Sequence, residues 1–158
     1  MGVLSQIMDV KVKLTAFESF MSENGKEESI SKLNVEGNRM IIELDSGEEY
    51  LVLTECEADE EAEFEIRETI WAFNSPFIIE HMRNCDKLSV AQKDMLSKAI
   101  KKIQENLCEN ANPLIEALID DVDTFVYDAI QAEGRGNFIS GYDGKEHEAM
   151  GCYIYRID

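Results

Sequence analysis

The sequence predicts a single α+β domain in which an N-terminal β-hairpin, a run of central helices and a C-terminal β-hairpin follow one another. Three observations lead to this prediction. Short β-branched and apolar runs flank turn residues near both ends of the chain, capped segments of helical period fill the middle, and the 158 residues are 44% hydrophobic. A chain of this length has the usual size of one domain, so we expect residues 1–158 to form one core.

The first forty residues carry the weakest pattern. Apolar spacing favours a helix around Leu14–Met21, and Lys26–Ser31 is predicted to be a polar loop. The runs Arg39–Leu44 and Glu49–Leu53 are separated by the turn residues Asp45–Glu48, which predicts the N-terminal β-hairpin.

Start signals mark the central helices. Thr54 and Glu57 have the spacing of a capping box, followed by a predicted helix over Glu57–Phe73. Ser75-Pro76, Ser89 and Asn112-Pro113 are further start signals, and Gly134 is a predicted C-cap. The remaining predicted helices are Phe77–Met82, Val90–Cys108, Leu114–Ile119 and Thr124–Ala132.

The spacing of apolar residues changes from a helical to a strand-like pattern after the last predicted helix. Asn137–Tyr142, a turn at Asp143-Gly144 and the run Cys152–Ile157 predict the C-terminal hairpin.

Composition excludes several classes of function. The chain has 33 carboxylates against 15 Lys and Arg, a formal charge of -18. Such a surface repels nucleic-acid phosphate and anionic lipid, so we expect neither direct nucleic-acid binding nor membrane binding. The apolar stretch Thr69–Ile79 is too short to span a bilayer, and Met1–Asp9 does not have the pattern of a secretory signal. A cytoplasmic protein is therefore expected.

The cysteines are dispersed and form no Cys-x-x-Cys pair. This spacing favours neither a zinc site nor a disulfide framework, and we expect the thiols to be reduced and mostly buried. The four are Cys56, Cys85, Cys108 and Cys152.

The acidic residues are concentrated. Glu43–Glu68 holds twelve carboxylates and one cation, and Glu105–Glu133 holds eight carboxylates with no Lys or Arg. Glutamates four apart on a helix lie about 6 Å apart along its axis, a spacing that can imitate a row of phosphates. A solvated face that keeps the protein soluble explains the same pattern. The candidate partner-binding residues are Glu57, Glu60, Glu61, Glu63, Glu65 and Glu68.

Other candidate sites have simpler structural explanations. His81 and Cys85 are four apart but are only two ligands. Asp120, Asp121 and Asp123 lack the EF-hand pattern, and helix capping explains Asp121 and Asp123 more simply. Arg135 is isolated in an acidic region, where it pairs with a carboxylate or contacts a partner. We therefore expect no catalytic residues, no metal, no cofactor and no enzymatic activity.

The densest apolar segment, Trp71–Ile79, also has two readings. Core packing is the usual explanation for such a segment, whereas an exposed share of it would mark a homodimer or partner interface.

Two segments resemble a known group of proteins. EEYLVLTECEADEEAEFEIRETIWAFNSPFIIEHM and EGRGNFISGYDGKEHEAMGCYIYRID are similar to an uncharacterised family of small acidic proteins of bacteriophages and mobile elements. The resemblance implies a phage context and no specific chemistry. We expect a non-enzymatic protein that binds a basic, nucleic-acid-binding host or phage protein in the host cytoplasm, as a DNA-mimic inhibitor of host defence. The alternative is an accessory structural protein that oligomerises through an apolar interface.

Overall fold

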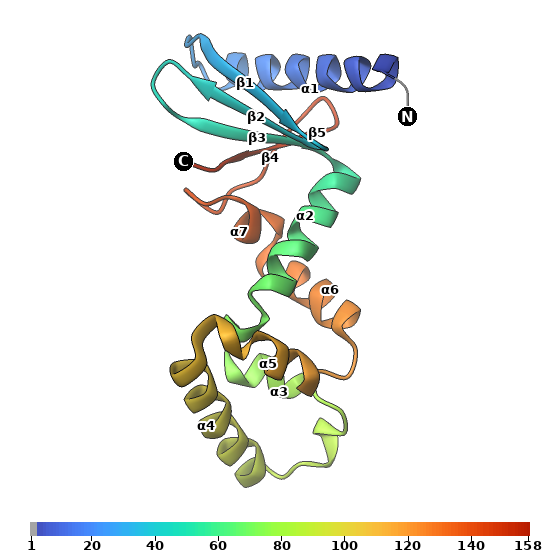
Figure 1. The fold of residues 1–158 in the computed structure, drawn as a ribbon, viewed down its shortest axis with the longest axis vertical. Coiled ribbons are helices and arrows are strands. Elements are labelled where there is room, and N and C mark those ends of the chain that lie inside the picture. The colour runs from blue at the N-terminus through green and yellow to red at the C-terminus, as the bar shows by residue number, and fades with distance from the viewer. Residues whose placement is uncertain (1–2) are drawn as a thin grey trace. The chain divides into compact units, whose positions relative to one another are not determined.

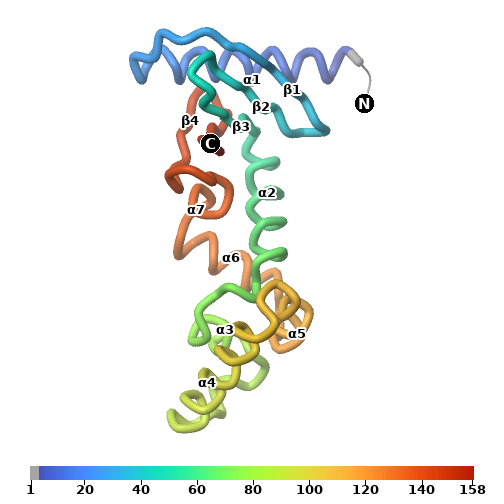
Figure 2. Tube along the Cα trace, turned by 60° about the vertical axis from the view of Figure 1, so that its left-hand side comes forward, coloured from blue at the N-terminus to red at the C-terminus, as the bar shows by residue number. Residues whose placement is uncertain are grey.

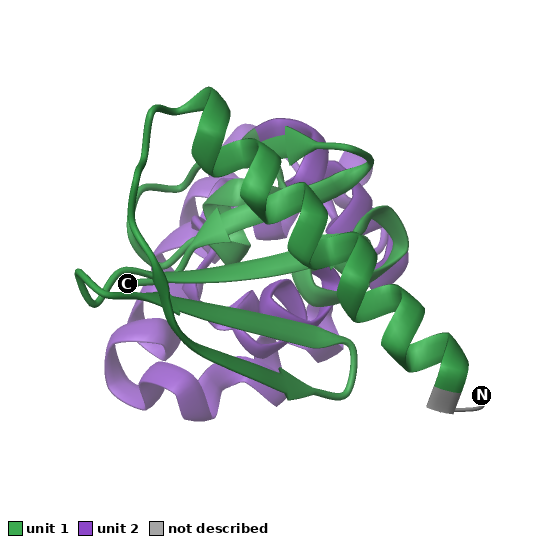
Figure 3. Ribbon diagram, turned by 90° about the horizontal axis from the view of Figure 1, so that it is seen from above, with its two compact units in different colours: residues 1–62, 133–158 green, residues 63–132 purple. Residues whose placement is uncertain are grey.

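The computed structural model describes residues 3–158 and divides into two compact units, coloured separately in Figure 3. Unit 1 comprises residues 1–62 and 133–158, and unit 2 comprises residues 63–132. That residues 1–158 form one domain remains a prediction. No helix in the described part of the chain is long and apolar enough to cross a membrane.

Unit 1 contains one antiparallel sheet of five strands in the order β1-β2-β3-β5-β4 (Figure 1). The predicted N-terminal hairpin is present as its β2 and β3. The strands are β1 (Ile30–Glu36), β2 (Arg39–Leu44), β3 (Glu49–Thr54), β4 (His147–Ala149) and β5 (Cys152–Arg156).

Helix α1 (Val3–Glu23) covers one face of this sheet, where it contacts β3, β5 and β4 (Figure 1). Its Phe17 and Phe20 rings pack against Tyr50, with ring centroids 5.4 and 5.7 Å apart. Alternate strand residues such as Ile42 and Ile154 complete this core and are fully buried, as the period of two requires.

The opposite face of the sheet presents Leu51, Leu53 and Tyr155, all buried. Within unit 1, α7 (Arg135–Ile139) and the first part of α2 (Glu55–Glu68) lie on the side of the sheet away from α1 (Figure 1 and Figure 2). Ala58 of α2 and Ile139 of α7 are buried. Both faces of the sheet are therefore covered, which explains why β3 is apolar at successive positions.

The predicted architecture of two separate hairpins is wrong, because β5 pairs directly with β3 and joins both ends of the chain in one sheet. Residues 137–142 do not form a strand. Residues 137–139 belong to α7, and β4 is instead the partner of β5. The sequence reading also missed β1 and shortened α1. Strands at the two ends of the sequence with helices between them do fit the predicted order.

Unit 2 is helical, and its caps explain where its helices begin. Ser89 and Gln92 form a capping box at the start of α4. Asn74, one residue before the predicted Ser75, caps α3 by accepting a hydrogen bond from Phe77 N at 2.9 Å. Unit 2 contains the C-terminal part of α2. Its other helices are α3 (Ser75–Glu80), α4 (Val90–Leu107), α5 (Asn112–Leu118) and α6 (Val122–Glu133). Short 3₁₀ turns lie at Ile70–Ala72, Cys85–Lys87 and Cys108–Ala111.

Candidate functional site

The predicted acidic surface lies on α2, and its first glutamate has a structural role. Glu57 accepts a hydrogen bond from Thr54 N at 2.8 Å, and Thr54 Oγ1 accepts one from Glu57 N at 3.5 Å. This is the reciprocal capping box that the sequence predicted. It satisfies two backbone amides at the start of the helix.

Glu57 is also the partner of a buried lysine. Its carboxylate lies 2.6 Å from the Lys13 ammonium, which in turn is 3.3 Å from Asp9 and donates to Asn38 O at 2.8 Å. The Lys13 side chain is 2% exposed and that of Glu57 is 14% exposed. A charge removed from water requires such compensation, so Glu57 joins α2 to α1 and is not free for a partner.

Two more of the predicted glutamates pair with arginines of the same chain. Arg39 lies 3.2 Å from Glu61, and Arg67 donates to Glu63 at 2.8 Å and to Asp123 at 2.5 Å. Each of these two glutamates pairs with an arginine of its own unit. Cations of the same chain therefore neutralise part of the acidic face.

The remaining members of the six differ in exposure. Glu60 and Glu68 are exposed, and neither has an ion pair within the described residues. Glu65 is half-buried and has interactions of its own. Exposed carboxylates that are free to meet a partner's cation are therefore fewer on α2 than the sequence suggested.

Arg135 is a structural residue of unit 1. Its guanidinium makes a two-pronged contact with Glu146, at 2.9 and 3.0 Å, and reaches Asp59 at 2.9 Å. It also stacks over Tyr153 at 4.3 Å. The carboxylates raise the pKa of Arg135, although burial alone would lower it. Of the two readings of Arg135, carboxylate pairing is the one observed.

The residues around Arg135 hold the chain in a tight arrangement. A Cβ on Gly136 would lie 2.5 Å from Gly144 O, so only glycine allows this approach. The Tyr155 hydroxyl donates to Glu146 at 2.5 Å, and burial together with this acceptor raises the pKa of Tyr155. The segments Gly134-Arg135-Gly136 and Tyr142-Asp143-Gly144 therefore contribute to the packing of unit 1.

A second charged network lies at the start of β3. The Lys26 ammonium contacts Glu48 and the Tyr50 hydroxyl, and Tyr50 donates to Glu48 at 2.7 Å. Arg156 lies 3.2 Å from the other Glu48 oxygen. Hydrogen bonds from Lys26 and Tyr50 lower the pKa of Glu48.

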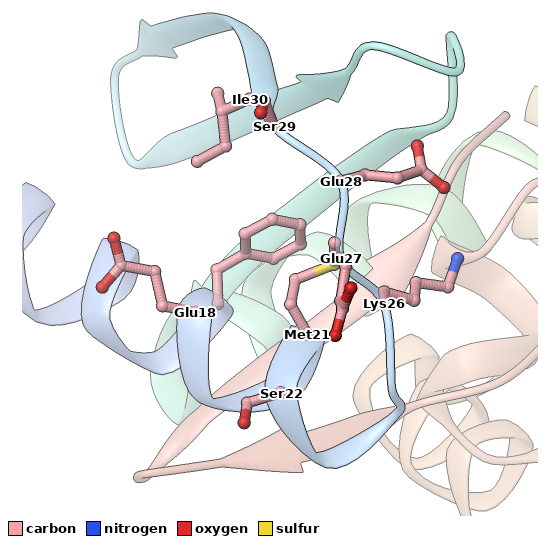
Figure 4. A pocket seen from close by; sticks show the side chains of 9 residues that line it. Glu18, Met21, Ser22, Lys26, Glu27, Glu28, Ser29 and Ile30 are labelled. Atoms are coloured by element: carbon pink, nitrogen blue, oxygen red, sulfur yellow. The ribbon is translucent and has the colours of Figure 1, made fainter.

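A surface groove of about 530 Å³ lies between α1 and the loop that leads to β1 (Figure 4). Met21 lines it on the apolar side, and Glu18 and Glu27 border it from the helix and the loop. Lys26 is engaged with Glu48 and Tyr50. This lining favours a cation with an apolar stem over an anion.

The other candidate ligands are not brought together. His81 Nε2 lies 2.9 Å from Asp128 and Nδ1 lies 2.8 Å from Phe77 O, whereas Cys85 Sγ donates to Glu80 O at 3.2 Å. Both ring nitrogens of His81 therefore have hydrogen-bonding partners within unit 2. No group of three His, Cys, Asp or Glu in residues 3–158 is arranged to hold a metal ion.

The three aspartates have separate partners. Asp121 Oδ1 accepts hydrogen bonds from Asp123 N and Thr124 N at 3.0 and 3.2 Å, which caps α6 and lowers the pKa of Asp121. Asp120 pairs with Arg83 at 2.7 Å. Capping and ion pairing therefore explain this cluster.

The apolar segment Trp71–Ile79 packs inside unit 2. Phe73 and Phe77 each lie 4.9 Å from the Phe125 ring, edge to face. Asn112, which the sequence reading assigned to a helix start, is the first residue of α5, and its side chain accepts a hydrogen bond from Trp71 N at 3.0 Å. Core packing is thus the observed role of this segment.

The cysteines differ from expectation in exposure. All four are free thiols, but only Cys152 is buried, and burial raises its pKa. Cys56 and Cys108 are exposed, so the prediction that most are buried was wrong.

Sequence reasoning missed two exposed apolar surfaces of unit 1. One is the N-terminal half of α1, and the other is β1. The side chains are Leu4 (80% exposed), Ile7 (59%), Met8 (69%) and Val12 (52%) on α1, and Ile30 (37%), Leu33 (40%) and Val35 (44%) on β1. The alternation of Leu33-Asn34-Val35-Glu36 was the available signal for the strand.

Comparison of this chain with protein-family models, with curated proteins and with solved structures finds no match.

Proposed function

We propose that this chain is a non-enzymatic binding protein whose acidic surface docks on the basic surface of a nucleic-acid-binding protein and competes there with nucleic acid. The observation that carries this proposal is the excess of carboxylates. Even if each of the 15 cations neutralised one of the 33 carboxylates, 18 would keep their charge. Internal pairing therefore leaves a strong negative field, which speeds encounter with basic surfaces.

The excess is greater in unit 1. Unit 1 has twenty Asp and Glu against eight Lys and Arg, a formal charge of -12, and unit 2 has thirteen against seven, a formal charge of -6. On α2, Glu55, Glu60 and Glu68 are the exposed glutamates that lack an internal ion pair. Glu60 and Glu68 are the two of these that belong to the predicted partner-binding residues, so the proposed contact is centred on them, whereas Glu57, Glu61 and Glu63 add to the field from fixed positions.

The resemblance to acidic phage proteins gives this proposal a biological setting. A DNA-mimic inhibitor would occupy the basic groove of a host defence or transcription protein. The interaction would take place in the host cytoplasm.

The experiment is a pull-down from bacterial lysate at about 0.1 M and about 0.5 M salt, conditions whose Debye lengths differ enough to expose charge-driven binding. The proposal expects a nucleic-acid-binding protein that is captured at the lower salt, released at the higher salt and displaced by added double-stranded DNA. Glu60→Lys with Glu68→Lys should abolish its capture.

A matched control makes the test specific to α2. Glu109→Lys with Glu133→Lys changes the net charge equally and also alters one exposed glutamate in each unit. This control should retain most of the capture. If both double variants lose capture equally, the contact is not on α2, and capture that resists salt and DNA would overturn the proposal.

An accessory structural role through an apolar interface is the second candidate. Trp71–Ile79, the segment that the sequence suggests for such an interface, packs within unit 2, but the exposed apolar side chains of α1 and β1 favour self-association elsewhere.

A further inference from the structure

Strand β1 forms an open edge of the sheet in unit 1. It pairs with β2 on one side only, and all seven of its residues are exposed. The other edge strand, β4, has only three residues. A long exposed edge offers unpaired backbone donors and acceptors to another strand.

The register of the sheet tells which backbone groups of β1 are free. Leu44 N donates to Glu48 O, and Leu44 O accepts from Gly47 N, both at 2.9 Å, so the backbone groups of Leu44 point to the β3 side. In an antiparallel sheet this direction alternates along a strand, so Ile41 and Glu43 point to β1. Their partners Asn34 and Lys32 are bound to β2. Leu33 and Val35 therefore direct their N–H and C=O groups outward.

We propose that two copies of this chain join edge to edge through β1, antiparallel and about a twofold axis at Asn34. Leu33 of each copy then lies opposite Val35 of the other, and these outward-pointing residues exchange backbone hydrogen bonds. Lys32 lies opposite Glu36, twice in the dimer. The two five-stranded sheets become one continuous sheet.

The sequence of the strand favours a second copy over another occupant. Lys32-Leu33-Asn34-Val35-Glu36 is complementary to itself about Asn34 in charge and in apolar character. A twofold axis at Leu33 would instead place Ile30 opposite Glu36 and leave Lys32 opposite Asn34. Strand Ile30–Glu36 contains one Lys and one Glu and is therefore neutral, although the whole chain has a charge of -18. Pairing of two copies through this strand therefore does not bring two strands of like net charge together.

This interface is independent of the acidic surface of α2. None of the proposed contact glutamates lies on β1, and the paired strands bury Leu33 and Val35, whose association does not weaken with salt. Dimerisation at about 0.5 M salt together with loss of the captured protein would separate the two proposals. Either proposal can fail alone.

The test exchanges the charges of the strand. Sedimentation velocity from about 10 µM to about 1 mM protein should show the wild-type chain dimerising, and Lys32→Glu or Glu36→Lys alone should weaken the dimer about tenfold or more. The double variant should regain dimerisation, and an equal mixture of the two single variants should form heterodimers. In both cases a glutamate again lies opposite a lysine.

The design excludes an effect within one copy. Lys32 faces Glu43 and Glu36 faces Arg39 in the same sheet, so the double variant still carries like charges at both internal positions. Recovery can then arise only between copies. A wild-type chain that stays monomeric at about 1 mM, or a double variant that does not recover, would overturn the proposal.

A cross-link gives a second readout. In this register the two Asn34 residues face each other as a non-hydrogen-bonded pair, at a Cα separation that a disulfide spans. In a chain with Cys56, Cys85 and Cys108 changed to Ser, Asn34→Cys should give a covalent dimer on a non-reducing gel. Lys32→Cys, whose two copies lie far apart, should not. Equal cross-linking of the two variants would contradict the register.

Discussion

Replacement of Lys13 by Met tests whether Glu57, in the first turn of α2, has a structural role. Met keeps much of the apolar stem of the lysine but removes the ammonium that contacts Glu57, Asp9 and Asn38 O. Glu57, 14% exposed, is then left with one backbone donor, Thr54 N. The variant therefore isolates the charge of the pair from its packing.

The magnitude follows from burial. Loss of one member of a buried ion pair costs about 3–5 kcal/mol, because the other charge stays buried without compensation. The remaining hydrogen bond and partial exposure of Glu57 reduce this cost, so we expect Lys13→Met to lower the free energy of unfolding by about 2–4 kcal/mol. Addition of Glu57→Gln removes the uncompensated charge, and the double variant should lose less than the sum of the two single variants.

Lys98→Met is the matched control. Lys98 pairs with Asp94 at 2.7 Å, but their side chains are 72% and 62% exposed, so the expected loss is below about 0.5 kcal/mol. Urea unfolding of the full chain followed by circular dichroism measures the loss, and amide exchange in α1 assigns it to unit 1. If Lys13→Met costs no more than Lys98→Met, the structural role of Glu57 is refuted.

Three further predictions concern unit 1. Arg135→Lys should lower the free energy of unfolding by about 1–2 kcal/mol in urea, because an ammonium cannot make the two-pronged contact; equal stability would contradict this. Gly136→Ala should lower the free energy of unfolding by at least about 2 kcal/mol in the same assay, because its Cβ would overlap a backbone oxygen. An unchanged free energy of unfolding would show that the loop can move to accommodate the Cβ. The folded-state pKa of Glu48 lies below the ordinary value of 4.5, so its contribution is present above that pH and is lost as pH falls through the lower value. Acid titration of unfolding should therefore show a shallower decline in Glu48→Gln; an unchanged slope would exclude Glu48 as a source of acid sensitivity.

Local signals in the sequence were read correctly where short-range chemistry decides the structure. The capping box at Thr54, the helix start at Ser89 and the hairpin of β2 and β3 depend on residues within a few positions of one another. Asp121 capping α6 belongs to the same class. These features need no knowledge of the rest of the chain.

Errors arose where distant residues decide the structure. The run 137–142 has strand-like residues, but the close approach of Gly136 to the backbone of residue 144 and the contacts of Arg135 place residues 137–139 in α7. Strand β1 was read partly as a polar loop because its residues are exposed on both faces, so no buried stripe marks it. Tertiary pairing overrides local propensity in both cases.

The sequence by itself determined the charge of this protein, the starts of α2, α4 and α5, and the order of its strand-rich and helical regions. It also showed that α2 is acidic. Which of those acids remain free was decided only by the tertiary structure, because the cations that pair with Glu57 and Glu61 come from α1 and β2. Charge is a sum over the chain, whereas the availability of a carboxylate depends on which cation the fold brings within about 4 Å of it.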